Sequence, residues 1–301
     1  MNKRIKFILC AAAGLLALVI TIYPLASNYF GERHMSYIQT KYTEAVESLD
    51  NTEITAARDA AKEYNATLNN VTDKAYSKEA LIQASESYDA ILNVRGDGIM
   101  GYIEIPKIEV NLPIYHGTEE KTLEHGTGHL LGSSLPIGGR GSHSVITGHS
   151  GLSGQKLFSD LERLRAGDVF YIHVLDSTLA YMVADIYKVL PEDTSKLTVD
   201  PIRDVVTLVT CTPYGVNTHR LLVRAERIEY ITPDMVQLFM EEQEVETVTS
   251  TWQQQYVRGI LIGLSLILLA VTALGGSWMV KAWKDYRNEP WQGKRGRHET
   301  Y

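Results

Sequence analysis

Two long apolar runs, one near each end of the chain, constrain this sequence more than any other feature. Residues 5–25 are almost wholly apolar, and residues 259–280 contain no charged residue. Each run has about the length of one bilayer crossing, which takes about 20 residues. Uncharged runs this long seldom occur inside soluble folds, so two transmembrane helices are favoured over a pair of buried core helices. A cleaved signal peptide is the alternative interpretation of the first run.

Basic residues lie beside both runs. Lys3, Arg4 and Lys6 flank the start of the first run. The tail after the second run holds Lys281, Lys284, Arg287, Lys294, Arg295 and Arg297. Basic residues close to a crossing tend to stay in the cytoplasm, so both ends are predicted to lie inside the cell. The prediction is therefore a multi-pass protein of the cell membrane, with residues 27–256 forming an extracellular domain.

The segment between the two runs changes character near residue 95. Residues 32–94 contain no glycine or proline and repeat apolar residues at helical spacing, which predicts two or three amphipathic helices. Short apolar runs separated by glycine and proline follow, which is typical of a β-sandwich or a closed barrel. The expected strands are residues 100–105, 110–115, 144–147, 169–175, 179–189, 205–210 and 220–230. Residues 233–246 favour a terminal helix.

Cys211 stands at the end of one expected strand, in the segment Thr207-Leu-Val-Thr-Cys211. The chain's other cysteine, Cys10, lies inside the first apolar run, so a disulfide between the two is not expected. An unpaired cysteine is often a buried and inert side chain. However, a strand end followed by Pro213 and Gly215 is an exposed and rigidly held position, which suits a nucleophile.

A thiol nucleophile needs positive charge and a proton-handling partner nearby. A new strand is expected to begin at Arg220, so Cys211 and Arg220 can lie at the mouths of adjacent antiparallel strands. An arginine there offers fixed donors to an oxyanion or a carbonyl. Among nine histidines, His149 is preferred because it follows a strand in a glycine-flanked turn. His219 is disfavoured, because neighbours in a strand face opposite sides.

No metal, cofactor or nucleic acid is expected. His125 and His129 are four residues apart, but the glycines around them argue against a helix. No cysteine or carboxylate cluster completes a metal-ligand set there. The formal net charge of −7 implies no broad basic surface for nucleic acid.

The segments around these three candidates resemble the catalytic motifs of sortases. The likeness is carried by Ile146-Thr-Gly-His149 and Thr207-Leu-Val-Thr-Cys211, followed by Arg220. More narrowly, the chain resembles class C, the pilin-polymerising sortases of Gram-positive bacteria. The segments similar to class C are residues 98–107, 112–117, 128–130, 134–136, 148–152 and 211–220.

This resemblance implies a mainly β fold. The expected architecture is an eight-stranded sortase-type β-barrel with an N-terminal helical extension and two flanking transmembrane helices. The implied segments are a cytoplasmic stub with the first transmembrane helix (1–26), the helical extension (27–94), the catalytic barrel (95–231), a helix and connector (232–256), the C-terminal transmembrane helix (257–280) and a basic cytoplasmic tail (281–301).

The resemblance also implies roles for the candidates. Cys211 would attack the Thr–Gly carbonyl of an LPXTG-like sorting motif and form a thioacyl enzyme. His149 would protonate the departing glycine amine, and Arg220 would hold the motif and stabilise the oxyanion. A lysine amine on the next pilin would resolve the thioacyl enzyme, so the expected partners are pilin subunits and other proteins with LPXTG-like motifs.

Other functions stay open at this point. A sortase that attaches surface proteins to cell-wall peptide would share the chemistry and differ only in the acceptor amine. A catalytically silent membrane protein that binds pilins is a further alternative, and so is a hydrolytic cysteine protease.

One departure of the sequence from class C matters for access to the site. Many members carry a lid before the barrel, with an Asp-Pro-aromatic motif that blocks the active site. Here residues 71–78 read Val-Thr-Asp-Lys-Ala-Tyr-Ser-Lys, and no proline lies anywhere from residue 25 to 105. An absent or atypical lid is therefore expected, with Asp73 and Tyr76 as the candidate substitutes for the motif.

Overall fold

The computed structural model describes residues 33–69, 87–150 and 156–230, with a few short helical pieces in the two apolar runs. The chain divides into two compact units, one made of Met1–Thr21 with Gln254–Tyr301 and the other of Ile22–Gln253. None of the helices in the described part combines the length and apolarity that a bilayer crossing requires.

Several predicted segments fall wholly or mostly outside the described residues. These are the two transmembrane helices, the helix and connector at 232–256, the basic tail and the lid region at 71–78. They stay predictions.

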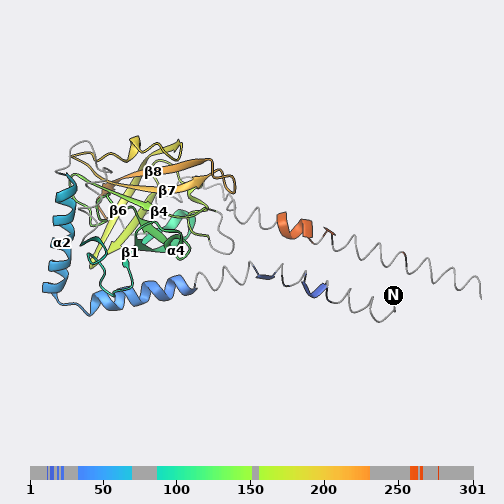
Figure 1. Ribbon diagram of the computed structural model, residues 1–301, viewed down its shortest axis with the longest axis horizontal. Helices are drawn as coiled ribbons and strands as arrows, with labels where there is room; N and C mark the ends of the chain where they lie inside the picture. Colours follow the sequence, from blue (N-terminus) through green and yellow to red (C-terminus); the bar gives the residue numbers. More distant parts are fainter. Residues whose placement is uncertain are drawn as a thin grey trace, which may run out of the picture. The chain divides into compact units, whose positions relative to one another are not determined.

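The second unit contains a closed barrel of eight strands (Figure 1). The strands are β1 (Ile99–Ile105), β2 (Val110–His116), β3 (Thr127–His129), β4 (Ser142–Thr147), β5 (Val169–Val174), β6 (Ser177–Val189), β7 (Asp204–Thr212) and β8 (His219–Ile228). Their order around the barrel is β1-β2-β3-β4-β7-β8-β6-β5. The pairs β2/β3 and β4/β7 are parallel, and the other pairs are antiparallel. The expected mainly β fold and eight-stranded barrel are confirmed.

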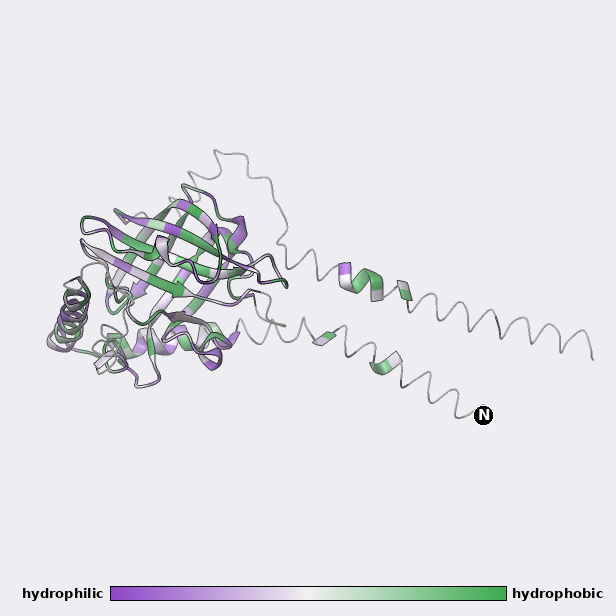
Figure 2. Cartoon of the chain, turned by 45° about the horizontal axis from the view of Figure 1, so that its top comes forward, coloured by the Kyte–Doolittle hydropathy of each residue, from purple (hydrophilic) through white to green (hydrophobic). Residues whose placement is uncertain are grey.

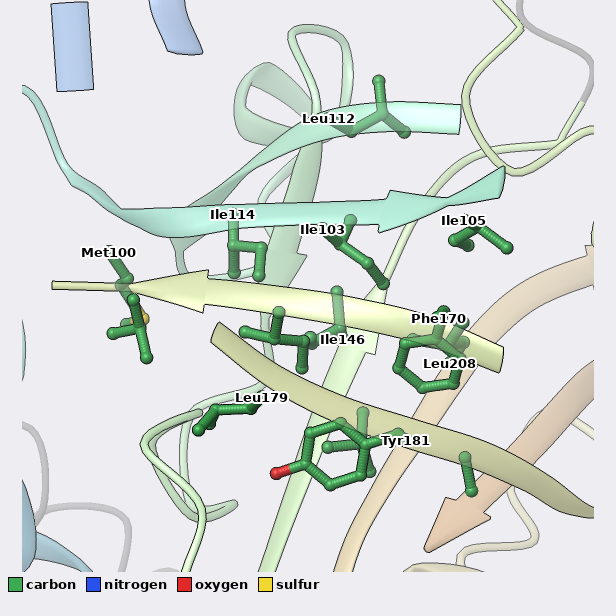
Figure 3. Close-up of a cluster of buried hydrophobic side chains, with 14 of the residues drawn as sticks. Met100, Ile103, Ile105, Leu112, Ile114, Ile146, Phe170, Leu179, Tyr181 and Leu208 are labelled. Atoms are coloured by element: carbon green, nitrogen blue, oxygen red, sulfur yellow. The ribbon is translucent and has the colours of Figure 1, made fainter. Parts of the chain in front are cut away.

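The barrel closes around an apolar interior. Figure 3 shows side chains from several strands meeting there, among them Ile103, Ile146 and Phe170, which are fully buried. Hydrophobic and hydrophilic residues follow one another along the strands (Figure 2). Alternate residues of a strand face opposite sides of a sheet, so a strand buried on one face needs an apolar residue at every second position. Burial of this interior is the main stabilising contribution to the fold.

Short helical turns connect the strands. They are the 3₁₀ turns Pro106–Ile108, Leu161–Arg163 and Ser195–Leu197 and the one-turn helix α4 (Glu120–Leu123). The helix α4 and strand β3 both belong to the connection between β2 and β4.

Two helices precede the barrel. Residues 33–47 are helical, and α2 (Asn51–Asn69) follows after a short break. Asp50 begins α2 with a capping box: its Oδ1 accepts hydrogen bonds of 2.8 Å from the backbone N–H groups of Thr52 and Glu53. In return, Glu53 Oε2 accepts a 2.9 Å bond from the Asp50 N–H. This reciprocal pairing satisfies orphan donors of the first turn and separates the two helices.

These helices attach to the barrel through polar contacts with its backbone. The buried Tyr42 hydroxyl donates to the Met100 carbonyl at 2.8 Å and accepts from the Leu175 N–H at 2.9 Å. On α2, the Arg58 guanidinium pairs with Asp176 in the turn between β5 and β6. The extension is therefore joined to β1 and to the β5–β6 turn.

The amide of Asn65 makes a two-way contact with the buried backbone of Leu135. Its Nδ2 donates to the Leu135 carbonyl at 3.2 Å, and its Oδ1 accepts from the Leu135 N–H at 2.7 Å. We expect Asn65→Ala to lower the free energy of unfolding by about 1–3 kcal/mol, because it leaves a buried N–H unpaired. Urea unfolding followed by circular dichroism, with hydrogen exchange at Leu135, measures the effect.

The matched control is Asn111→Ala, since the exposed Asn111 amide donates to Oε1 of the half-buried Gln39 at 2.8 Å in a contact open to solvent. This substitution is expected to change the free energy of unfolding by less than about 0.5 kcal/mol. Equal effects of the two substitutions would contradict the structural role of Asn65.

Candidate active site

The pairing of β7 with β8 places Cys211 beside Arg220. The two residues are direct cross-strand partners, one position before the last pair, Thr212 with His219. Cys211 is a free, half-buried thiol. The expectation that Cys211 and Arg220 lie side by side at the ends of adjacent strands is confirmed.

Both side chains lie on the outer face of the barrel. The interior of β7 is lined by Val206 and Leu208, and β8 contributes Leu221 to the same core. Residues at odd positions of β7 and at even positions of β8 therefore face outward. The thiol of Cys211 and the guanidinium of Arg220 consequently share the outer wall at one end of the barrel.

His149 reaches the same end through the parallel pairing of β4 with β7. Two hydrogen bonds continue this pairing beyond the last strand residue. The Gly148 N–H donates to the Val209 carbonyl at 3.0 Å, and Ser150 Oγ donates to the Cys211 carbonyl at 2.7 Å. His149 lies between these two attachment points, so its backbone is held next to that of Cys211.

The strand order therefore puts the thiol between the other two candidates. β7 lies between β4 and β8 in the barrel, with His149 following β4 and Arg220 near the start of β8. The Nη1 group of Arg220 donates to the carbonyls of Asn217 and His219, both at 3.3 Å. These bonds hold the guanidinium over the end of its own strand.

A small apolar cluster adjoins the thiol on this outer face. Val209 and Leu222 form the next outward pair along β7 and β8, two positions from Cys211 and Arg220. Leu197, from the connection between β6 and β7, packs in the same cluster. The thiol therefore has a charged neighbour on one side and an apolar wall along its strand.

The chain has the sequence features and the fold of a known family. A family model for the Sortase domain matches residues 103–228. Sortase C1 from Streptococcus agalactiae is 42% identical to this chain, with a TM-score of 0.60 over 65% of this chain and 100% of that one. The chain belongs to the sortase family. Members of this family are cysteine transpeptidases.

Two further relatives extend this comparison. Sortase C from Streptococcus pneumoniae, whose structure was described in terms of catalysis and pilin substrate specificity, is 41% identical, with a TM-score of 0.58 over 65% of this chain and 99% of that one. Sortase A from Streptococcus agalactiae serotype III (strain NEM316) is 34% identical over 131 residues. That match covers 42% of this chain and 52% of the relative, so it spans about half of the curated protein's length.

Residues 156–164 of this sortase, called the supporting segment, contact both segments that carry the site residues. The Phe158 N–H donates to the His149 carbonyl at 3.0 Å, and the Phe158 ring packs against Gly148. On the other side, the Thr212 hydroxyl donates to the carboxylate of Glu162. One short segment thus contacts both the turn that carries His149 and the strand end that carries Cys211.

Two site contacts were not predicted from the sequence. Ser150 follows His149 directly, but nothing in its neighbours indicated that its hydroxyl would bind the backbone of Cys211. Glu120 lies 3.6 Å from His149, measured from Oε1 to Nε2, although the two are 29 positions apart. Only the pairing of β3 with β4, which the sequence did not reveal, brings that carboxylate near.

The two histidines considered as a metal pair lie in different surroundings. His125 is exposed, and its Nδ1 donates to the Lys121 carbonyl at 2.8 Å. His129 is fully buried: Nε2 lies 2.8 Å from the Ser134 carbonyl and Nδ1 lies 2.9 Å from the Tyr88 hydroxyl. The described residues contain no group of three or more His, Cys, Asp or Glu arranged to hold a metal ion.

Gly148 is essential to the position of the His149 turn. A Cβ atom at this residue would lie 2.7 Å from Cδ2 and 2.9 Å from Cγ of the Phe158 ring. We expect Gly148→Ala to cost about 1–3 kcal/mol of unfolding free energy through overpacking and to lower the rate of thioester formation at Cys211. Urea unfolding and trapping of the acyl-enzyme by mass spectrometry measure the two effects.

The double variant Gly148→Ala/Phe158→Ala supplies the control. Alanine has no side-chain atom beyond Cβ, so it removes the ring atoms that the new methyl group would meet, and this variant should recover part of the lost rate. A double variant no faster than Gly148→Ala would show that the ring contact is not the cause.

Two buried histidines predict an acid-sensitive fold. Burial lowers the pKa of His129 and of His143 from 6.5 to about 4. At pH values between about 4 and 6.5, these histidines are protonated in the unfolded chain, whereas the buried rings of the folded protein stay neutral. Stability is therefore full above pH 6.5 and falls toward pH 4, by about 1.4 kcal/mol per pH unit for each ring. Urea unfolding at a series of pH values measures this slope.

A variant isolates the contribution of one ring. His143→Asn removes one of the two groups, so its free energy of unfolding should depend less steeply on pH than that of the unsubstituted protein. His125→Ala changes an exposed ring and should leave the slope unaltered. Parallel slopes for His143→Asn and the unsubstituted protein would contradict the assignment.

Proposed function

We propose that this protein is a membrane-anchored transpeptidase that cleaves an LPXTG-like sorting motif between Thr and Gly and transfers it to a pilin lysine amine. The observation that carries the proposal is the β4-β7-β8 arrangement, which gathers His149, Cys211 and Arg220 at one end of the barrel. Acyl transfer by a thiol requires a nucleophile, a proton-handling group and a donor for the oxyanion.

The first half-reaction forms a thioester. The Cys211 thiolate attacks the Thr carbonyl, and the resulting oxyanion is stabilised by the Arg220 guanidinium. When the tetrahedral intermediate collapses, the Thr–Gly C–N bond breaks, and the protonated His149 gives its proton to the departing glycine nitrogen. The carboxyl group of Thr is then bound to the Cys211 sulfur.

The second half-reaction forms an isopeptide bond. A neutral lysine amine attacks the thioester carbonyl, and His149 takes up the proton that the amine loses. The C–S bond breaks and releases the Cys211 thiolate. Because His149 is protonated again, the enzyme is back in its starting state. An amine acceptor, rather than water, distinguishes this reaction from proteolysis.

Several features support the sorting-motif substrate and the pilin acceptor. The half-buried Val209, packed against the buried Leu222, offers an apolar surface for the leucine of such a motif beside the thiol. The likeness to sortase C from Streptococcus pneumoniae, described with pilin substrate specificity, favours pilin as the acceptor. The two apolar runs at the chain ends support anchoring in the cell membrane, with the barrel outside the cell.

Attachment of surface proteins to cell-wall peptide is the second candidate. The likeness to sortase A from Streptococcus agalactiae favours it, but that match has lower identity and spans about half of the relative. The two candidates differ in the amine that resolves the thioester, so the choice of acceptor decides between them.

The test incubates the full-length protein with a sorting-motif peptide and a pilin subunit, followed by mass spectrometry of covalent products. We expect a peptide–pilin isopeptide adduct. Cys211→Ala should abolish it, and His149→Ala and Arg220→Ala should each lower its rate by about 100-fold or more. His125→Ala replaces an exposed histidine that has no part in the proposed chemistry, so it should leave the rate unchanged.

Two results would contradict the proposal. An adduct that persists in Cys211→Ala would remove the proposed nucleophile. Transfer to a cell-wall peptide amine but not to pilin would retain the chemistry and favour the second candidate.

A further inference from the structure

A carboxylate lies beside the proposed acid of the reaction. Glu120 Oε1 is 3.6 Å from His149 Nε2, slightly beyond hydrogen-bond length. That ring nitrogen is buried and has no hydrogen-bond partner among the residues that the structure describes. We propose that Glu120 is a positioning residue, whose carboxylate binds the protonated imidazole of His149 and orients it for proton transfer. The inference rests on the proposed role of His149.

The sheet fixes the place of Glu120. β3 pairs with β4 in antiparallel register, with Gly128 opposite Thr147. Continued by two residues, this register brings the chain just after α4 opposite His149. Leu123, the last residue of α4, is buried and anchors the turn. Strand pairing therefore brings the Glu120 side chain close to His149, although 77% of the Glu120 side chain is exposed.

Backbone hydrogen bonds also fix the start of α4. The N–H groups of Thr122 and Leu123 both donate to the Glu119 carbonyl, at 2.9 and 3.0 Å. These bonds fix the backbone on both sides of Glu120. Only the side-chain torsions of Glu120 have to change for its carboxylate to move the few tenths of an ångström that a hydrogen bond requires.

Several other charges near the site have partners of their own. Glu119 binds Lys121 at 2.9 Å. Further charged or titratable groups around His149 are Glu124, which follows α4, Lys156, Asp160, Glu162 and Arg163 of the supporting segment, Cys211 of β7 and Arg220 of β8. Lys156 lies 3.7 Å and Arg163 lies 3.6 Å from the buried carboxylate of Asp160. Among the described residues, the only ion contact of Glu120 is with His149.

This contact orients the ring. A carboxylate within reach of Nε2 favours one orientation of the imidazole over the others. Solvent screens an exposed carboxylate, so the contribution is moderate. A ring held in one orientation is more often aligned with the departing glycine nitrogen, so Glu120 increases the rate of thioester formation.

The test follows the ¹⁵N signals of His149 by NMR in the full-length protein, labelled with ¹⁵N-histidine. The Cys211→Ala background removes the neighbouring thiol. We expect Glu120→Gln to change the chemical shift of His149 Nε2, because it removes the carboxylate beside that nitrogen. Glu119→Gln makes the same change of net charge one residue away and should leave that chemical shift unaltered.

A second measurement is the rate of thioester formation with Cys211 intact. Glu120→Gln should lower this rate about two- to fivefold without changing the KM for the sorting-motif peptide, because the acid loses its alignment while binding is unaffected. Raising the salt concentration to about 1 M shortens the screening length to about 3 Å, so the difference between the unsubstituted protein and Glu120→Gln should become smaller.

The outcomes separate this proposal from the proposed function. Equal chemical shifts of His149 Nε2 in Glu120→Gln, Glu119→Gln and the parent protein would overturn the role of Glu120, whatever the activity. A changed Nε2 shift in Glu120→Gln, together with no transpeptidase activity in the unsubstituted protein, would support the contact and count against the proposed function instead.

Discussion

The parallel pairing of β4 with β7 is the interaction on which the site depends. These strands are separated by 56 residues of intervening chain, yet their register holds from Ser142 with Asp204 to Thr147 with Val209. A slip by one residue would turn every outward side chain of a strand to the opposite face. The apolar interior prevents such a slip, so the energy that closes the barrel also sets the distance between His149 and Cys211.

Much of this fold could be predicted from the sequence, because most of its strands carry apolar patterns several residues long. Strong alternation and glycine or proline punctuation predicted seven strands, and the spacing between Cys211 and Arg220 predicted their pairing. Strand β3 was not predicted, because Thr127–His129 is three residues long and lies among glycines. Its existence depends on partners in β2 and β4, which no local pattern of residues specifies.

The candidate site likewise contains residues that local sequence patterns indicate and contacts that only the fold creates. Residue types at strand ends indicated His149, Cys211 and Arg220, because each is a chemical group in an exposed turn or strand end. Contacts such as those of Ser150 and Glu120 arise from register between distant segments, and serine and glutamate are too common to indicate them. The buried state of His129 was likewise hidden, since only the fold surrounds that ring with Tyr88 and Ser134.

The outward orientation of Cys211 has a consequence for the size of what the enzyme can process. A thiol inside a barrel lumen would admit only molecules narrower than the lumen. A thiol on the outer wall needs only a short extended stretch of polypeptide laid against β7, while the folded body attached to that stretch stays in solvent. Bulk on either side of the reacting bond is thereby tolerated.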